Sequence, residues 1–312
     1  MNTPIVLSRD DVTRLLDWTS VLEATREGLL VAGDPPAASS VSAQVMYPSG
    51  SLHLKSASLH DRNILSVKSN LRPTRGGVSG VLLAYDLQTE KLAGIIDAGL
   101  MTAWRTGAIA AVAAQHLLGR RAVRVAVLGV GPVGRQCAAG LLEVLNITDV
   151  RFWSHRPERS LAVASEFGGY IRASAHRDVA DAVREADVIV TATPAAEPIL
   201  TEGPLQSGVI ILAMGADTVG KQELATSLLD HAVVIADVPD DARKVGESAH
   251  LAVNRQGLVT PLAQWLSSKS SPEHADIPLV FDSVGSSHVD AAVTAVIMAR
   301  AHAEGRGRPL PW

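Results

Sequence analysis

The chain has 312 residues, of which 47% are hydrophobic and 4% aromatic, and its formal net charge is −4. At roughly 150 residues per domain, this length predicts about two domains. The balanced charge, without a block of Lys or Arg, and the few aromatic side chains argue against a nucleic-acid partner. No stretch approaches ~18 apolar residues and the N-terminal segment lacks a signal-peptide pattern, so we expect a soluble cytoplasmic protein with no membrane partner.

Thiol and metal chemistry are disfavoured by the same composition. Cys137 is the only cysteine, which excludes an internal disulfide and a multi-cysteine zinc site. It lies in an Ala-rich helical run, where a buried apolar role is favoured over that of a nucleophile. The ten histidines show no HxxxH or HExxH spacing, so no metal site is expected.

The first third of the chain predicts an α+β arrangement. Ser20 and Glu23 have capping-box spacing, which predicts a helix beginning at Ser20. Short β-like runs separated by turns then predict an antiparallel meander over residues 41–97. The predicted strands are 43–47, 51–59, 64–70, 80–86 and 91–97.

The pattern changes after an Ala-rich helix predicted over 102–118. Short apolar runs rich in Val and Ile then alternate with helix-length segments, which is typical of a doubly wound parallel sheet covered on both faces. The runs are 123–131, 149–155, 187–194, 208–215 and 232–238, and the helical segments are 135–146, 158–167 and 176–186. A terminal helix is predicted over 288–303, followed by a mobile tail.

A glycine-rich motif directly follows the strand segment RVAVL (124–128) and opens a helix. It contains Gly129, Gly131, Pro132, Val133 and Gly134. In this context the first glycine makes a tight turn, the second admits a pyrophosphate, and the third lets helix and strand pack closely. The motif therefore predicts a dinucleotide site, against the alternative of a merely glycine-rich turn.

The end of the next run indicates which nucleotide binds. NAD sites usually have an acidic residue about 20 positions after the glycines, and Ser154 stands there instead. His155, Arg156 and Arg159 add hydrogen bonds and positive charge that suit a 2′-phosphate. We therefore favour NADP(H) over NAD(H), the alternative being a solvated basic helix start.

Five ordered motifs carry a resemblance to a known family. They are VKSN (67–70), MTAWRTGAIAA (101–111), LGVGPVG (128–134), GADTVGKQEL (215–224) and VFDSVG (280–285). In this order and spacing the chain resembles the ornithine cyclodeaminase/μ-crystallin family. The resemblance implies hydride exchange between a nicotinamide and the α-carbon of an amino acid or its imine.

The resemblance also implies the domain organisation. Residues 120–280 are expected to form the Rossmann dinucleotide-binding domain, a doubly wound α/β fold. Residues 1–119 together with 281–312 are expected to form an antiparallel α+β domain that binds substrate and forms a homodimer through its sheet.

Three matched residues are the expected catalytic set. Lys68 and Arg105 match positions that bind the substrate carboxylate, and a buried Arg needs an anion. Asp217 matches the acid/base position, with Lys221 as a neighbouring substrate-binding residue. The alternative for Asp217 is the N-cap of a short helix.

Further residues are assigned on the same resemblance. Thr191 and Thr193, at a strand end, and Thr102 are expected to border the cofactor, although strand threonines equally pack in a core. Val284 and Gly285 are expected in the substrate site.

The chain departs from the family pattern in its first strands. An additional carboxylate-binding Arg is absent from 37–44, the usual Met-Pro is replaced by Lys55-Ser56, and His53 stands where ornithine cyclodeaminase has an acidic residue. In one reading, Lys55 restores the positive charge that binds a carboxylate, and His53 replaces the acidic residue as a proton-transfer group. In the other reading, both are exposed strand residues without a role. Ornithine is therefore not a safe inference as the substrate.

Three functions remain open from the sequence. The favoured one is an NADP(H)-dependent oxidoreductase that reduces a cyclic or open-chain imine or oxidises the corresponding amino acid. The second is a cyclodeaminase for ornithine or lysine that recycles its cofactor internally. The third is an NADPH-dependent binding protein without turnover, as in the crystallin branch.

Overall fold

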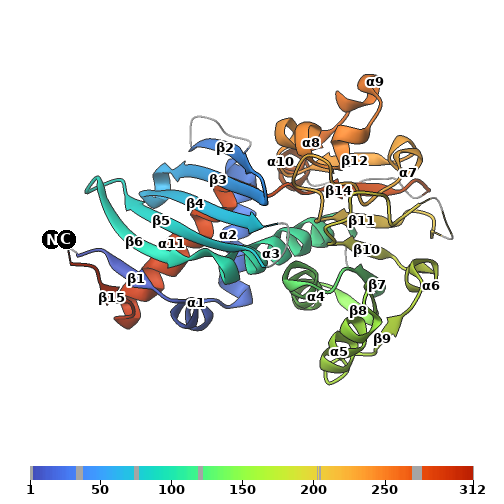
Figure 1. Ribbon diagram of the computed structural model, residues 1–312, viewed down its shortest axis with the longest axis horizontal. Helices are drawn as coiled ribbons and strands as arrows, with labels where there is room; N and C mark the ends of the chain where they lie inside the picture. Colours follow the sequence, from blue (N-terminus) through green and yellow to red (C-terminus); the bar gives the residue numbers. More distant parts are fainter. Residues whose placement is uncertain are drawn as a thin grey trace. The chain divides into compact units, whose positions relative to one another are not determined.

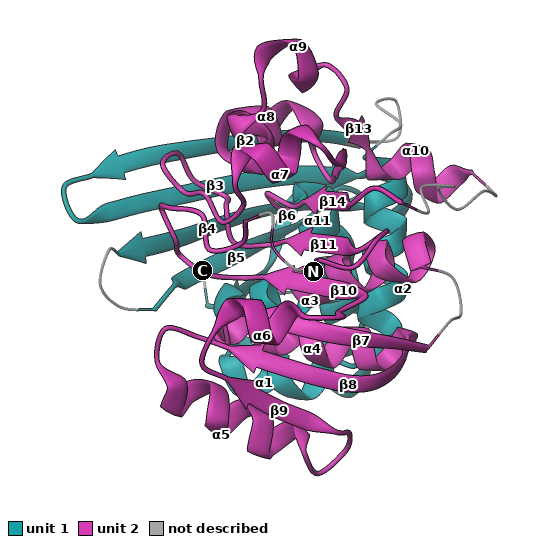
Figure 2. Ribbon diagram, turned by 90° about the vertical axis from the view of Figure 1, so that its right-hand side faces the viewer, with its two compact units in different colours: residues 1–105, 286–312 teal, residues 106–285 magenta. Residues whose placement is uncertain are grey.

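The computed structural model describes residues 3–32, 38–73, 77–118, 122–201, 203, 205–268 and 276–311. The chain folds into two compact units, shown as ribbons in Figure 1 and distinguished by colour in Figure 2. Unit 1 comprises Met1–Arg105 and Ser286–Trp312, and unit 2 comprises Thr106–Gly285. Among the described residues, no helix has both the length and the apolar character needed to span a membrane.

Unit 1 contains a seven-stranded sheet in the order β15-β1-β6-β5-β4-β3-β2. Its strands are β1 (Ile5–Leu7), β2 (Ala38–Tyr47), β3 (Gly50–Leu59), β4 (Ile64–Pro73), β5 (Ser79–Asp86), β6 (Lys91–Asp97) and β15 (Arg308–Pro309). Strands β2 to β6 pair antiparallel with their sequence neighbours. The predicted meander is therefore confirmed.

The prediction of a mobile C-terminal tail is wrong. Val6 and Arg308 are partners in an antiparallel pair of β1 with β15. The backbone N–H of Leu310 also donates to the carbonyl of Pro4. The tail is thus held by backbone hydrogen bonds to the first strand, which sequence patterns this short do not reveal.

The helices of unit 1 are α1 (Arg9–Leu15), α2 (Trp18–Val31), the 3-10 helix η1 (His60–Arg62), the first part of α3 (Ala98–Leu118) and α11 (Ser287–Glu304). The predicted start of the second helix at Ser20 is wrong. Asp17 caps α2, and its side chain accepts the backbone N–H of Ser20. Because the Asp17 side chain takes the N-cap position and binds this free N–H, the helix begins before Ser20, which lies in its first turn.

Unit 2 contains an eight-stranded sheet in the order β13-β12-β14-β11-β10-β7-β8-β9, with every described pairing parallel. Its strands are β7 (Ala122–Leu128), β8 (Asn146–Trp153), β9 (Ala173–His176), β10 (Val188–Thr191), β11 (Ile210–Ala213), β12 (Val233–Ala236), β13 (Thr260–Pro261) and β14 (Leu279–Asp282). The predicted doubly wound sheet is confirmed.

The helices of unit 2 follow or separate these strands, as the alternating pattern predicts. They are the remainder of α3, α4 (Pro132–Val144), α5 (Pro157–Phe167), α6 (Val179–Val183), α7 (Thr226–Asp230), α8 (Pro239–Val245), the 3-10 helix η2 (Glu247–His250), α9 (Val253–Gln256) and α10 (Leu262–Ser267). One face of the sheet packs in a core dominated by Val, Ile, Leu and Ala, and the strand residues of the other face are buried as well.

The boundaries between the two units differ from the domain boundaries expected after residues 119 and 280. Helix α3 is continuous, and its contacts pass from one unit to the other after Arg105. Strand β14 pairs with β11 and β12 inside the parallel sheet, so unit 2 extends to Gly285. The C-terminal helix α11 then returns to unit 1 and packs on α2 and on strands β2 to β4.

The contact between α2 and α11 depends on a glycine. A Cβ added at Gly28 would lie 2.8 Å from Cα of Val289 and 2.9 Å from the carbonyl oxygen of His288. Both atoms belong to the backbone of α11, so a side chain at position 28 forces the helices apart.

We expect Gly28→Ala to lower the free energy of unfolding by roughly 1–3 kcal/mol. The matched control is Gly99→Ala in α3, where the added Cβ would meet only the Asp97 carboxylate at 3.5 Å, so stability should stay level or rise slightly. Urea unfolding measures the stability of both variants. Equal free energies of unfolding for Gly28→Ala and Gly99→Ala would contradict the close contact between α2 and α11.

Candidate functional site

The glycine-rich turn between β7 and α4 has the geometry of a dinucleotide cradle. Gly129 has a φ of +105°, and a Cβ there would lie 2.5 Å from the carbonyl oxygen of Ala192. A Cβ at Gly134 would lie 1.8 Å from the carbonyl oxygen of Gly129, whereas one at Gly131 would meet no described atom within 4 Å. The first and third glycines therefore close the turn, and the second leaves open space beside the first turn of α4.

The basic segment after β8 lies at the surface. His155, Arg156 and Arg159 are exposed, and Ser154 is half-buried. The Ser154 hydroxyl donates to the carbonyl of Arg156 at 2.6 Å, and the His155 ring lies edge-on to Trp153 with centroids 4.7 Å apart. These contacts shape the segment that leads into α5.

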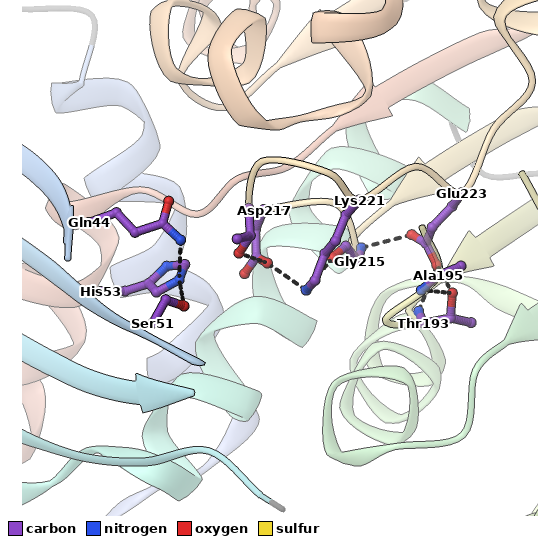
Figure 3. A network of polar contacts seen from close by, with 10 residues as sticks. Gln44, Ser51, His53, Thr193, Ala195, Gly215, Asp217, Lys221 and Glu223 are labelled. Atoms are coloured by element: carbon purple, nitrogen blue, oxygen red, sulfur yellow. Dashed lines mark hydrogen bonds and ion pairs between the residues drawn. The ribbon is translucent and has the colours of Figure 1, made fainter. Parts of the chain in front are cut away.

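Asp217 lies in the loop that follows β11, at the carboxyl edge of the parallel sheet. Lys221 Nζ lies 2.9 Å from Asp217 Oδ1 and donates to the carbonyl of Gly215 at 3.1 Å (Figure 3). No helix begins at Asp217, since the next one, α7, starts at Thr226 with Ala225 as its cap. The alternative role of Asp217 as a helix N-cap is therefore wrong.

The loop that carries Asp217 is fastened by Glu223, a residue that sequence reasoning missed. The buried Glu223 carboxylate accepts the hydroxyls of Thr191 and Thr193, each at 2.7 Å. It also accepts the backbone N–H groups of Thr193 at 2.6 Å and Gly215 at 2.9 Å (Figure 3). Both threonine hydroxyls thus bind Glu223, which ties the segments after β10 and β11 together.

Three further buried carboxylates continue this pattern. Glu247 accepts the backbone N–H groups of Glu223 and Leu224 at 2.7 and 3.2 Å. Asp282 in turn accepts the N–H groups of Glu247 and Ser248 at 3.1 and 2.7 Å. A chain of carboxylates therefore holds the backbone along this edge of the sheet.

Asp237, at the end of β12, is the fourth member. Its carboxylate accepts the Ser283 hydroxyl at 2.7 Å and the N–H groups of Val284 at 3.1 Å and Gly285 at 2.9 Å. Gly285 has a φ of +84°, a conformation that glycine adopts readily. The expected substrate residues Val284 and Gly285 are thus positioned through their backbone.

Burial governs the protonation of these groups. It raises the pKa of Glu247 to about 8, and the neighbouring Asp282 and Glu223 carboxylates act in the same direction. Burial also raises the pKa of Asp282 to about 7 and that of Glu223 above its usual value. Burial raises the pKa of Cys137 to about 12, so this thiol is not a nucleophile at neutral pH.

In unit 1 the expected carboxylate-binding residues meet at a single acidic side chain. Lys68 Nζ lies 2.6 Å from Asp290 Oδ2, and Arg105 Nε lies 2.9 Å from Asp290 Oδ1. Lys68, Arg105 and Asp290 are only 2%, 4% and 0% exposed. Asp290 lies on α11, Arg105 on α3 and Lys68 in the middle of β4 rather than at a strand end. This buried ion cluster joins three elements.

The cluster has a definite charge state. Burial raises the pKa of Asp290, but Arg105 and Lys68 outweigh it, so the pKa lies below its usual value. Burial, followed by the Arg105 charge, lowers the pKa of Lys68 well below its usual range. The two neighbouring cations therefore favour the ionised form of Asp290.

The residues that depart from the family pattern lie beside this cluster. Lys55 is directly opposite Lys68 in the β3–β4 pairing. His53, which is buried, has its Nε2 atom 2.9 Å from Ser51 Oγ and 3.1 Å from Gln44 Nε2 (Figure 3).

Thr102, expected near the cofactor, lies in the unit 1 part of α3. Its hydroxyl accepts Asn70 Nδ2 at 3.3 Å. Asn70 is buried in β4 and was not predicted as a site residue.

A family model described as the ornithine cyclodeaminase/mu-crystallin family matches residues 18–305. The chain belongs to this family.

Two named relatives and one solved structure illustrate the similarity. A Delta(1)-pyrroline-2-carboxylate reductase of Bacillus thuringiensis subsp. konkukian (strain 97-27) is 27% identical over 340 residues, covering 99% of this chain and 100% of the relative. The ketimine reductase mu-crystallin of Mus musculus is 30% identical over 65% of this chain and 64% of its own. An archaeal alanine dehydrogenase dimer with bound NAD superposes with a TM-score of 0.92 at 23% identity, covering 99% of each chain, and shares the fold.

The raised pKa of Glu247 predicts how this family member responds to pH. Between the unfolded value of ~4.3 and the folded value of about 8, the unfolded chain releases a proton that the folded chain keeps. Folding stability therefore falls as pH rises through this range, and the loss ends above pH ~8.

Glu247→Gln cannot titrate, so its stability relative to the wild type should increase from pH 5 to 8, by at most ~1.4 kcal/mol per pH unit. Urea unfolding across this range measures the difference. The exposed Glu158→Gln serves as control, and a pH-independent difference for Glu247→Gln would contradict the assignment.

Proposed function

We propose that this protein is an NADP(H)-dependent oxidoreductase acting on C–N bonds, which reduces a cyclic or open-chain α-imino acid or oxidises the corresponding amino acid. The observation that carries the proposal is the pair of buried cations, Lys68 and Arg105, that share one carboxylate. Two cations and one anion leave a net positive charge, which favours binding of the substrate carboxylate.

Asp290 acts in this proposal as a positioning residue. Its two oxygens contact Lys68 and Arg105 separately, so each cation is held in place while the guanidinium retains terminal N–H groups for a carboxylate. The ion pairs also reduce the cost of burying two positive charges before substrate binds.

Asp217 exchanges the proton at the substrate nitrogen. It lies at the carboxyl edge of an open parallel sheet, where α/β proteins bind ligands, and its ion pair with Lys221 favours the ionised form. The ionised Asp217 can take a proton from an amine during oxidation. In reduction the protonated carboxyl supplies it.

The residues of the glycine-rich turn fit a dinucleotide, because Gly131 leaves open space beside the first turn of α4. A reduced nicotinamide supplies a hydride to the imine carbon. Ser154, His155, Arg156 and Arg159 are proposed to bind a 2′-phosphate, so NADP(H) is preferred over NAD(H). Thr191 and Thr193, held by Glu223, shape the segment proposed to border the nicotinamide.

A homodimer is part of the proposal. The face of the unit 1 sheet that carries Val41, Val45, Leu71 and Val81 exposes apolar side chains, with Val41 and Val45 exposed by 62% and 52%. An apolar sheet face of this kind is typical of an interface. A cytoplasmic location is also proposed, because reduced nicotinamide cofactors are supplied inside the cell.

The Asp217–Lys221 pair favours a second candidate, a cyclodeaminase of the ornithine or lysine type. In that reaction the substrate's own side-chain amine captures the imine and ammonia leaves. Ammonia release without net change in reduced nicotinamide would select this reading. Cofactor binding without any turnover would instead identify a crystallin-type binding protein.

Assays of NADPH consumption with cyclic imines and with keto-acid and amine pairs test the proposed reaction. We expect Asp217→Asn to lower kcat by roughly 10²–10⁴-fold, because it removes the proton exchange, while NADPH binding measured by fluorescence is unchanged. Asp240→Asn, a highly exposed carboxylate in the same unit, is the control. An Asp217→Asn enzyme as active as the wild type would exclude the acid/base assignment.

We expect Arg156→Gln and Arg159→Gln each to raise KM for NADPH about tenfold, since each removes a charge-assisted bond to phosphate. KM for NADH should not change, because NADH lacks the 2′-phosphate. Arg172→Gln, which removes an exposed guanidinium elsewhere in unit 2, should leave both values unchanged. Equal effects on the two cofactors would contradict the proposed preference.

A further inference from the structure

Two polar bridges join strand β4 to helix α3 in unit 1. Lys68 and Arg105 meet at the Asp290 carboxylate, and Asn70 Nδ2 donates to the Thr102 hydroxyl at 3.3 Å. Lys68 and Asn70 share one face of β4, since side chains two residues apart point to the same side of a strand. Thr102 and Arg105 are three residues apart and are therefore neighbours on one face of α3. The Asn70–Thr102 bridge thus stands beside the ion cluster.

One end of the Asn70 amide has no partner. Asn70 is only 1% exposed, and its Oδ1 atom has no hydrogen-bond partner among the described residues. A buried carbonyl oxygen has lost its hydrogen bonds to water, so leaving it without a donor is costly. This oxygen therefore points to a donor that a bound molecule supplies.

Gly80 keeps open the space that this oxygen occupies. It lies directly opposite Asn70 in the β4–β5 pairing, and a Cβ there would lie 2.0 Å from Oδ1 and 3.0 Å from Cγ of Asn70. A side chain at position 80 would therefore displace the amide. The oxygen end of the amide lies over β5, whereas its nitrogen end contacts Thr102 on α3. The fold thus holds in place a carbonyl oxygen that the described side chains do not use.

The proposed substrate carries the missing donor next to its carboxylate. A protonated α-imino acid and the corresponding amino acid both have an N–H group on the carbon that bears the carboxylate. With that carboxylate on Lys68 and Arg105, the nitrogen lies closest to the next residues on the same face of β4, about 6.8 Å along the strand. A hydrogen bond from a positively charged N–H is also stronger than one between neutral groups. A keto acid offers no such donor.

We propose that Asn70 binds the α-nitrogen of the substrate, with its Oδ1 accepting an N–H of the protonated imine or of the amino acid. This inference rests on the proposed function, because it places the α-carboxylate on Lys68 and Arg105. In reduction, hydride adds at the imine carbon, the electron pair of the C=N bond passes to nitrogen, and that pair takes the proton from the Asp217 carboxyl. The N–H that Asn70 holds is not transferred. Asn70 therefore selects an imine over the keto acid from which it forms.

Calorimetry with the protein saturated with NADPH tests the inference, because an amine and a reduced nicotinamide do not react. One ligand pair is proline and tetrahydrofuran-2-carboxylate, in which a ring oxygen replaces the nitrogen. The other is alanine and propionate, which lacks the amine. We expect at least one amino acid to bind roughly tenfold more tightly than its analogue, because the analogue loses a hydrogen bond from a charged group.

Three variants separate the oxygen of Asn70 from its other contacts. Asn70→Leu removes the oxygen with little change in volume and should reduce the preference to about twofold or less. Asn70→Asp keeps an acceptor but no donor for Thr102, and it should retain the full preference. The matched control is Ser66→Ala, which removes a buried hydroxyl from the same face of β4 and should also retain it.

Several results would overturn the inference. They are a wild type that binds neither amino acid more tightly than its analogue, a preference that survives Asn70→Leu, and a preference lost equally in Asn70→Leu and Asn70→Asp, which would indicate a structural role through Thr102. Weaker NADPH binding by Asn70→Leu with an intact preference would instead assign the oxygen to the cofactor, and would also overturn it.

The same measurements distinguish this inference from the proposed function. A preference that Asn70→Leu removes, in a protein that consumes no NADPH with any imine, would support the Asn70 site and reject the proposed reaction. Imine reduction whose kcat and KM are unchanged in Asn70→Leu would keep the proposed reaction and reject the role of Asn70.

Discussion

The buried ion cluster of Lys68, Arg105 and Asp290 is the constraint on which unit 1 depends. Three charges removed from water are tolerated only if each finds an opposite charge at short range, and the shared Asp290 carboxylate meets that requirement. The three residues come from β4, α3 and α11, which are far apart in the sequence. The cluster therefore explains why the C-terminal helix must return to a unit formed mainly by the N-terminal part of the chain.

Unit 2 meets the same problem of buried charge in a different way. Its buried carboxylates, Glu223, Glu247, Asp282 and Asp237, bind backbone N–H groups and hydroxyls rather than cations. Backbone N–H groups compensate a carboxylate only in part, so burial prevails and raises the pKa of Glu247 and Asp282. In return, the loops after β10, β11, β12 and β14 gain acceptors for N–H groups that irregular backbone leaves without partners.

Much of this architecture was predictable because its signals are local. Alternating and continuous apolar runs revealed the meander and the parallel sheet, and the glycine spacing revealed the turn before α4. The start of α2 and the pairing of β15 were missed, since Asp17 competes with Ser20 as a cap and a two-residue strand has no period. The register of the strands could not be predicted from the sequence either, so only the β3–β4 pairing shows that Lys55 lies directly opposite Lys68.

The site was predictable where a residue stood in a motif, and not where it acted through a partner. Arg105 was expected to need an anion, yet Asp290 was not named. The same reasoning applies to it, because an aspartate followed by the apolar run of α11 needs a cation if it is buried. Glu223 lies inside the motif GADTVGKQEL (215–224), but nothing local distinguishes an exposed glutamate from one that binds two strand-end threonines.

The contrast between Asp290 and Glu247 shows how neighbours decide the role of a buried carboxyl. Both are removed from water, but the neighbouring cations lower the pKa of Asp290, whereas burial and then the neighbouring carboxylates raise the pKa of Glu247 to about 8. An ionised carboxylate between two cations can hold them for an incoming anion without cancelling their charge. A protonated carboxyl contributes no such field and can only fasten backbone. The two cations that Asp290 holds in unit 1 support the proposed anion recognition, and the carboxylate chain of unit 2 accounts for the fixed geometry of the loop that carries Asp217.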